Sequence, residues 1–187
     1  MKEYFTEGVV LNCRPINETD RIVDIYTKNQ GRIETRVIGG RKILSKLSSH
    51  LDVLNFVRIR LIQKNRFTLV DVLVEDRFLS VRSDLRKYAG ILDLIFLMRA
   101  LTPIAMPDLS LWHFLVRSFK NGIINFGNFL RLAGYDPIFA TCQDCHLKGV
   151  EYFDTNDHSF LCAVCNARFN NFGSIYLSLK PIWRNQI

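Results

Sequence analysis

Four of the five cysteines of this 187-residue chain stand in two Cys-x-x-Cys pairs. The pairs are Cys142 with Cys145 and Cys162 with Cys165. Each pair places two sulfur atoms on one tight turn, and two such turns joined by a hairpin-sized loop can surround a single ion. Four thiolates in a tetrahedron are the ligand set of a structural Zn²⁺ site. Such a site has no open position for substrate or water, so we expect the cluster to hold structure and not to catalyse.

Other interpretations of the four cysteines stay open from the residues alone. Two disulfides would require an oxidising compartment, and the opening "KEYFTEG" does not resemble an export signal. A thioredoxin-like redox pair would require a reactive Cys-x-x-Cys at the start of a helix that follows a strand. An iron–sulfur cluster also uses four cysteines. We interpret His146 and His158 as bystanders, and Cys13 as a buried apolar thiol.

The charge of the chain indicates a polyanionic partner. The formal net charge is +7, from 25 basic and 18 acidic side chains, and nucleic acid is the simplest partner of that kind. Strand alternation would place Arg32 and Arg36 on one outward face and Arg58 and Arg60 on another, and a barrel could bring both faces to one groove that follows a phosphate backbone. The alternative is that these arginines are ordinary solvated residues that protect sheet edges. The predicted DNA-binding residues are Arg32, Arg36, Arg41, Lys42, Lys46, Arg58, Arg60, Lys64 and Arg66.

Other features argue against catalysis and against a membrane span. The four histidines are scattered, no nucleophile stands beside a base, and "GGRK" lacks the remaining residues of a phosphate loop. The most apolar stretch, Gly90 to Met106, is interrupted by Asp93, Arg99 and Pro103. We therefore expect a cytoplasmic, non-enzymatic protein with reduced thiols and no membrane contact.

The spacing of apolar residues differs between the front and the back of the chain, and this difference predicts an α+β protein. Residues 1–79 alternate apolar and polar positions in five runs, at 7–16, 20–27, 31–39, 52–63 and 67–78, with a short helix or loop between the third and fourth. In the third run Ile33, Thr35 and Val37 face one way, opposite to the arginines, and in the fourth Val57, Ile59 and Leu61 face inward. Five short strands fit the barrel of an OB-fold. Residues 80–187 show helical spacing over 80–101, with Ser83 as the expected N-cap, and over 106–122 and 124–134. We predict an OB-fold domain at 1–79 and a small α-helical domain at 80–187 that carries the zinc segment 142–165; the tail from 169 could be a helix or an extended cap.

Several stretches resemble the bacterial recombination mediator family RecO. The family's x-E-x-D-R-I/L-V stretch is similar to Glu18, Asp20 and the "RIV" that follows, and a later glycine-and-arginine pattern is matched by Gly31, Ile33, Gly39 and Arg41. "LVDVLVEDRFLSVRSDLRKYAGILDLI" resembles the passage from the last barrel strand into the first helix. "FLRLAGYDPIFATCQDCH" and "FLCAVC" resemble the family's two cysteine runs. The likeness touches nearly the whole chain.

The resemblance implies more than the residues alone. It implies an N-terminal OB-fold, a helical body and, in many members, a zinc site. It further implies binding of single- and double-stranded DNA near the bacterial nucleoid, annealing of complementary strands in the RecF pathway of recombinational repair, and action with RecR. It also implies contact with the acidic tail of the single-strand binding protein, leading to RecA loading. The chain looks shorter than usual members in the helical body and after Cys165, which would affect that tail contact more than DNA binding. The alternative function is an RNA-binding protein of translation or RNA processing, built from an OB-fold and a zinc ribbon.

Overall fold

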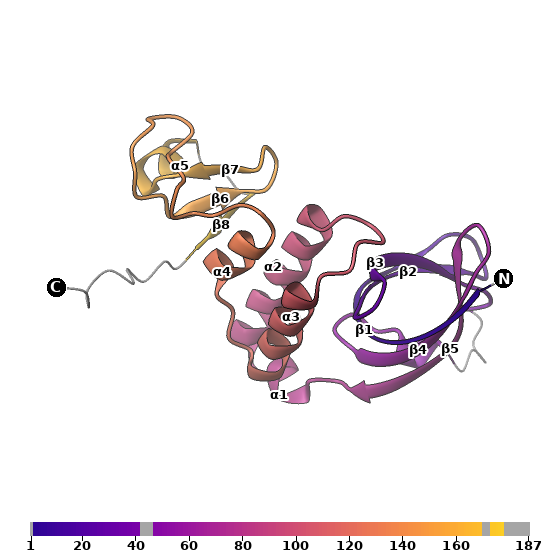
Figure 1. Cartoon of the computed structure of the whole chain (residues 1–187). Coiled ribbons are helices and arrows are strands. Elements are labelled where there is room, and N and C mark those ends of the chain that lie inside the picture. The colour runs from indigo at the N-terminus through magenta and orange to yellow at the C-terminus, as the bar shows by residue number, and fades with distance from the viewer. Residues whose placement is uncertain (1, 42–46, 170–172, 178–187) are drawn as a thin grey trace. The chain divides into compact units, whose positions relative to one another are not determined.

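The structure consists of two compact units. The computed structural model describes residues 2–41, 47–169 and 173–177 (Figure 1). One unit is formed by Met1–Ile91 and Thr102–Gly122, and the other by Leu92–Leu101 and Ile123–Ile187. The expected α+β class is confirmed. Whether residues 1–79 fold as a separate domain stays a prediction.

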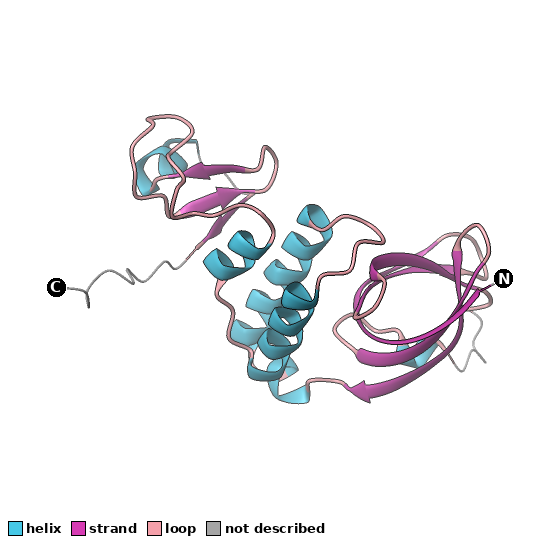
Figure 2. Ribbon diagram, in the orientation of Figure 1, coloured by secondary structure: helices cyan, strands magenta, loops and turns pink. Residues whose placement is uncertain are grey.

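Five strands of the first unit close into the expected barrel (Figure 2). They are β1 (Lys2–Pro15), β2 (Arg21–Thr27), β3 (Gly31–Val37), β4 (Phe56–Gln63) and β5 (Phe67–Asp76). Their order around the barrel is β1-β2-β3-β5-β4, and β4 pairs back to β1. All pairings are antiparallel except that of β3 with β5, which is parallel and joins only two residue pairs, Thr35 with Phe67 and Arg36 with Thr68. The barrel is therefore least tightly closed between β3 and β5.

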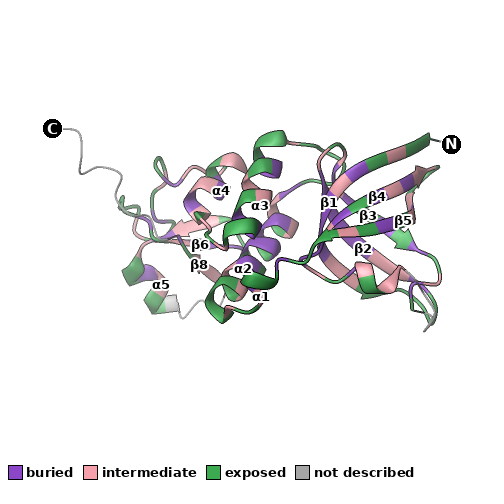
Figure 3. Ribbon diagram, turned by 90° about the horizontal axis from the view of Figure 1, so that it is seen from below, coloured by how far each residue is buried: buried purple, intermediate pink, exposed green. Residues whose placement is uncertain are grey.

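The barrel core follows the alternation of the sequence. Side chains on one face of β3 and β4 are buried and their neighbours are exposed or half-buried (Figure 3). This period-two pattern is what a strand with one apolar face requires. The inward residues expected on these two strands are all buried: Ile33, Thr35 and Val37 on β3, and Val57, Ile59 and Leu61 on β4. Between the two strands, the expected short helix is a 3₁₀ helix at Ser48–His50.

Three helices follow the barrel. They are α1 (Leu79–Arg82), α2 (Leu85–Leu101) and α3 (Leu109–Asn121). Asp84, not the expected Ser83, caps α2, because its Oδ1 accepts from the N–H groups of Arg86 and Lys87 at 3.0 and 3.2 Å. Ser83 ends α1 instead, where its N–H donates to Leu79. None of the helices in the described part of the chain is long and apolar enough to cross a membrane.

Helix α3 packs on the open end of the barrel within the first unit. Asp108 caps its N-terminus, and Gly122, with φ of +66°, ends it as expected. The ring of Trp112 lies 6.0 Å from that of Phe56 on β4, and Phe119 meets Phe78 edge-on at 5.8 Å. These aromatic contacts bury the apolar face of the helix.

The second unit holds the cysteine segment. It contains α4 (Phe126–Leu132), a sheet in the order β7-β6-β8, and α5 (Ala163–Phe169). The strands are β6 (Tyr152–Asp154), β7 (Ser159–Leu161) and β8 (Ser174–Tyr176). The tail therefore contributes a strand at 174–176, while residues 170–172 and 178–187 of the expected helix or cap lie outside the described residues.

Candidate functional site

The four paired cysteines converge on one point of the second unit. The Sγ atoms of Cys142, Cys145, Cys162 and Cys165 all lie within 4.8 Å of one another, and those of Cys145 and Cys162 are 3.8 Å apart. All four are free thiols. In a tetrahedron with Zn–S bonds of about 2.3 Å, each S–S edge measures about 3.8 Å. The cluster therefore has the dimensions of a four-thiolate metal site.

Two turns and a hairpin bring these cysteines together. In the first turn, His146 N donates to Cys142 O, and Cys142 N donates to Leu147 O, both at 2.9 Å. The β6–β7 hairpin then returns the chain to Cys162, which precedes α5, and Cys165 lies in the first turn of that helix. Cys165 N donates to the sulfur of Cys162 at 3.5 Å. Such N–H groups orient sulfur atoms around an ion and stabilise their negative charge.

The thiols have opposed pKa shifts. Burial raises the pKa of Cys142, but the N–H groups of Cys145, Cys162 and Asp144 outweigh it and lower this pKa to about 6. The hydrogen bond to Asp144, burial and the neighbouring thiols raise the pKa of Cys165 far above its usual value. Protein groups alone thus stabilise one thiolate and oppose another. A bound divalent cation would supply the positive charge that allows all four to ionise.

The two histidines of the cysteine segment are not part of the sulfur cluster. His158 Nδ1 is 3.0 Å from the hydroxyl of Tyr135, and its ring stacks on Phe153. His146 is exposed on the first turn, with φ of +58°. Neither contributes an atom to the group of four sulfurs.

Four of the predicted DNA-binding arginines form ion pairs. The alternation of apolar and polar residues along the strands did not reveal these pairs. Arg32 pairs with buried Asp24 at 3.0 Å and Arg36 with buried Asp20. Arg58 pairs with Glu75, and Arg60 with Glu3 at 3.3 Å. In each case the acid belongs to another strand or loop, so only the strand pairing brings it to the arginine. The DNA-binding role of these four arginines stays a prediction, for side chains whose charges face carboxylates.

The two arginine faces also lie on strands that are not neighbours. β5 pairs with both β3 and β4, and so separates Arg32 and Arg36 from Arg58 and Arg60. Exposed Asp71, Leu73 and Glu75 stand on β5 opposite or next to the β4 arginines. A single groove lined by all four arginines is therefore not what the strand order produces.

The remaining predicted residues differ among themselves. Arg41 donates to the backbone oxygen of Asn17 on the β1–β2 loop. Lys42 and Lys46 lie outside the described residues. Lys64 and Arg66 occupy the β4–β5 turn, are exposed, and have no ion pair among the residues that the structure describes. The last two are thus the predicted cations best placed to meet an external anion.

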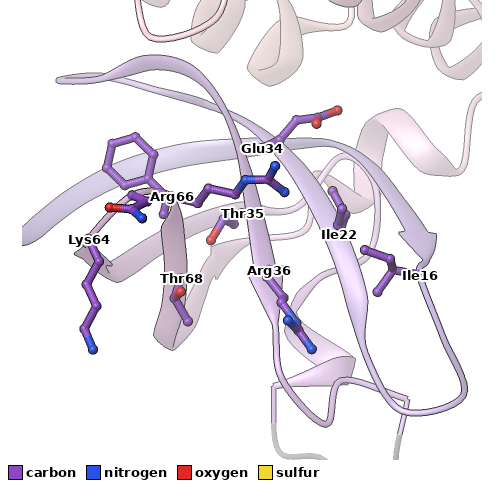
Figure 4. Close-up of a pocket in the computed structure, with 10 residues that line it drawn as sticks. Ile16, Ile22, Glu34, Thr35, Arg36, Lys64, Arg66 and Thr68 are labelled. Carbon is purple, nitrogen blue, oxygen red and sulfur yellow. The ribbon is translucent and has the colours of Figure 1, made fainter.

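Lys64 and Arg66 lie on the rim of a cavity of about 580 Å³ on the side of the barrel (Figure 4). In this view, Arg66 extends from the β4–β5 turn toward β3, while Lys64 and Arg36 point outward on either side. The carboxylate of Glu34 is also present, but it faces Arg14 at 3.7 Å. The lining comprises Ile16, Ile22, Glu34, Thr35, Arg36, Lys64, Asn65, Arg66, Phe67 and Thr68.

Comparison with known proteins agrees with this architecture. Residues 1–74 match the family model described as "Recombination protein O N terminal". The chain is 28% identical over 180 residues to the DNA repair protein RecO of Thermodesulfovibrio yellowstonii, an alignment that covers 89% of this chain and 72% of the relative. It is 26% identical to the RecO of Syntrophobacter fumaroxidans, over 78% of this chain and 62% of the relative. The chain is thus similar to the RecO family, both through its first 74 residues and through these relatives. These RecO relatives extend beyond their alignments, which span about two thirds of their length.

The RecO N-terminal match includes the barrel up to residue 74 of β5 and the described residues that line the cavity, whereas the four cysteines lie outside it. The structure also explains the residues of the β1–β2 loop that resemble the RecO motif. The carboxylate of Asp20 accepts hydrogen bonds from Gly39 N at 2.8 Å and from Arg36, and Arg41 N donates to Thr19 O at 2.8 Å. These hydrogen bonds therefore hold the β1–β2 loop, which forms one wall of the cavity, against the end of β3.

The cavity contains residues that the sequence did not single out. Ile16, Asn65 and Thr68 carry no pattern that distinguishes them from other strand and loop residues, and Ile22 was noted only as part of the stretch that resembles the family. Thr35 was predicted only as an inward-facing residue. It is 1% exposed, and its Oγ1 has no hydrogen-bond partner among the described residues. Only the three-dimensional arrangement could identify it, because an inward threonine on a strand is usually satisfied by its own backbone.

Proposed function

We propose that this RecO-family protein binds DNA on the side of the barrel that carries the cavity and acts as a non-enzymatic strand-annealing mediator of recombinational repair. The observation that supports this most directly is that two cations at the rim of a cavity on an OB-type barrel, Lys64 and Arg66, form no ion pair among the described residues. The relatives named above carry the name DNA repair protein. Action on the chromosome would place the protein in the cytoplasm, at the nucleoid.

The proposed mechanism is electrostatic. Cationic side chains neutralise phosphates and release the counterions condensed on the strand. Neutralisation lowers the repulsion between two complementary strands, so that bases can pair without any covalent step. The ion pairs on β4 leave that side with little net positive charge, whereas the two cations of the β4–β5 turn face no carboxylate in the part of the chain that the structure describes. The strand is therefore expected to follow the β3–β5 side.

We propose Zn²⁺ as the ion of the four-cysteine cluster, with Cys142, Cys145, Cys162 and Cys165 as its ligands. The four-sulfur donor set and the 3.8 Å separation of Cys145 and Cys162 fit tetrahedral coordination. Bound zinc would supply folding free energy to this segment and no reactive position, because four protein thiolates complete its shell.

The proposed partners rest on the family alone. They are single- and double-stranded DNA, RecR and the acidic tail of the single-strand binding protein, with RecA loading as the outcome in the RecF pathway. Annealing of complementary oligonucleotides coated with single-strand binding protein tests the tail contact. We expect faster annealing with the intact coat protein than with a coat protein that lacks its tail. Equal rates would contradict the tail contact but not DNA binding.

Two double substitutions of equal charge test the DNA site. The first variant, Lys64→Ala with Arg66→Ala, removes two cations that form no ion pair among the described residues. The second, Arg58→Ala with Arg60→Ala, removes two cations that face carboxylates. Fluorescence anisotropy with a labelled single strand should show weaker binding for the first variant. Its slope of log affinity against log salt should be shallower by about 1.4, since each single-strand phosphate contact contributes about 0.7.

The second variant is the control for net charge. An equal loss of affinity in both variants would place the strand elsewhere on the barrel. No binding by the unmodified protein at low salt would contradict the proposed function altogether. Stronger competition by RNA than by DNA of the same sequence would favour the alternative RNA-binding function.

A further inference from the structure

We infer that the cavity between β3 and the β4–β5 turn takes one unstacked nucleotide of a single strand, with its base inside and its phosphate at the cationic rim. This inference rests on the proposed DNA binding and specifies what that site recognises. The volume of about 580 Å³ falls within the range of about 300–1,000 Å³ that holds small-molecule ligands. A base with its sugar belongs to that size class.

The buried hydroxyl of Thr35 gives the cavity a polar group that lacks a partner. Its Oγ1 is buried and makes no hydrogen bond among the described residues, although almost all buried polar atoms of folded proteins are paired. Thr35 is one of the lining residues and in Figure 4 lies between the labelled side chains of Arg66 and Thr68. A base edge carries both donors and acceptors, and a hydroxyl can serve either. The Oγ1 atom has almost no accessible surface, so an inserted base would satisfy this group, whatever the base, once the neighbouring lining side chains shift.

The cavity also offers apolar surface to the faces of a base. Phe67, Ile16 and Ile22 are the apolar residues of its lining. Tyr4 meets the ring of Phe67 edge-on at 5.8 Å, and the hydroxyl of Tyr4 donates to Gln63 Oε1 at 2.9 Å. Phe67 is therefore held in place before any ligand arrives. Stacking of a base on an aromatic ring contributes about 1–3 kcal/mol to single-strand binding.

The rim provides the charge that a nucleotide phosphate requires. Lys64 and Arg66 are exposed there without a carboxylate partner among the described residues. Arg36 adds a third cation whose side chain stays 55% exposed despite its ion pair with Asp20. Glu34 is the one acidic lining residue, and Arg14 faces it at 3.7 Å. Apolar walls inside and cations outside match the polarity of a nucleotide from base to phosphate.

The wall beside Ile16 is rigid in advance of binding. Asn17 Oδ1 accepts from Thr19 N at 2.9 Å and from Asp20 N at 2.7 Å, and Ile16 N donates to Asp20 O. The carboxylate of Asp20 in turn holds Gly39 N. A preformed wall lowers the ordering cost of binding, and so makes a small cavity more effective.

A base in this cavity would explain a preference for unpaired DNA. A paired base would first have to leave its partner and its stack, which costs a few kcal/mol. A single strand can offer a base at much lower cost. A hydroxyl and apolar walls do not require a particular pattern of donors and acceptors on the base. The protein would therefore prefer single-stranded to double-stranded DNA without preferring any sequence.

The test compares two single strands that differ only in their bases. One is an oligothymidine of about 16 nucleotides, and the other is a strand of equal length with abasic sugars. Both present the same phosphates to the full-length protein. We expect the unmodified protein to bind the oligothymidine about tenfold more tightly, as base stacking of this size would produce.

Two variants locate the difference in the cavity. Thr35→Val removes the hydroxyl and keeps the shape, and should lower affinity for oligothymidine about fivefold, as for one lost hydrogen bond. Its melting temperature should equal or exceed that of the unmodified protein, since the hydroxyl has no partner to lose. Phe67→Leu removes the aromatic face and provides an independent second variant. Neither should change affinity for the abasic strand.

The outcomes separate this inference from the proposed function. Equal affinity of the unmodified protein for both strands, or equal losses for both strands in Thr35→Val and Phe67→Leu, would overturn base insertion. DNA binding on phosphates alone would then still hold if the Lys64 and Arg66 double variant weakens both strands. Absence of binding to either strand would overturn the proposed function itself.

Discussion

At the scale of single residues, Asp20 shows what a family motif can do structurally. It is 3% exposed, and its carboxylate accepts hydrogen bonds from Gly39 N, from the guanidinium of Arg36 and from the hydroxyl of Thr19. The backbone hydrogen bond from Gly39, followed by that from Arg36, holds the pKa of Asp20 well below its usual range. The charged form is therefore the one that the folded barrel requires.

This residue should make stability depend on acid pH. In the unfolded chain an aspartate takes up its proton near pH 4, whereas Asp20 resists protonation in the folded state. Its stabilising contribution is thus complete above about pH 4 and is lost as the pH falls below that value. Asp20→Asn should lower stability at neutral pH and flatten its decline between about pH 4 and 2, measured by urea unfolding. Exposed Glu18→Gln, in the same loop, is the matched control for the loss of one carboxylate, and a steep profile in Asp20→Asn would contradict this assignment.

At the scale of elements, the β2–β3 turn depends on a glycine for two reasons. Gly31 has φ of +67°, a conformation that side chains disfavour. A Cβ at this position would also lie 2.3 Å from the backbone oxygen of Met106 and 2.7 Å from Pro107 N. Next to it, Ala105 N donates to Arg32 O at 2.7 Å. The turn therefore serves as the surface on which the segment before α3 rests.

We expect Gly31→Ala to destabilise the first unit strongly. The positive φ alone should cost about 1–3 kcal/mol, and the collision with backbone atoms adds to it because backbone cannot move aside cheaply. Gly134→Ala is a matched control, since Gly134 has φ of +93° but open space around its Cβ position. Thermal unfolding should show a larger loss for Gly31→Ala. Equal losses would mean that conformation matters and the close approach does not.

At the scale of the whole molecule, the two candidate sites belong to different units. Every residue that lines the cavity lies within Met1–Ile91, and all four clustered cysteines lie within Ile123–Ile187. The barrel has its own core of buried aliphatic side chains from all five strands. The cysteine segment has a much smaller one, in which the thiols themselves pack with Leu161 and Tyr152. A small core of this kind would gain stability from a metal ion held by the four thiolates.

Removal of metal should therefore affect the two units unequally. We expect one zinc per chain, and treatment with a strong chelator should release it and make four further thiols reactive toward a thiol reagent. Hydrogen exchange should then rise in residues 142–165 and stay low in β1–β5. Affinity for single-stranded DNA should be kept, and Cys142→Ser should behave as the chelated protein does. A loss of barrel protection on chelation would contradict the independence of the two sites.

The sequence alone determined those features that depend on local geometry. Alternation along Gly31–Val37 and Phe56–Gln63 predicted which side chains enter the core, because successive residues of any strand face opposite ways. The cysteine spacing predicted the metal cluster for a similar reason, since a tight turn places the sulfurs of residues three apart beside one another. Asp108 and Gly122 bounded α3 through capping rules that involve only near neighbours.

Only the tertiary structure decided which charges are free and where a ligand can enter. Arg32 and Arg36 meet Asp24 and Asp20 because β2 lies beside β3, and β5 separates them from the β4 arginines. The hydroxyl of Thr35 loses its partner where β3 and β5 share only two residue pairs. These facts depend on which strands become neighbours. Strand order is set by the packing of the whole barrel, and no local pattern of residues records it.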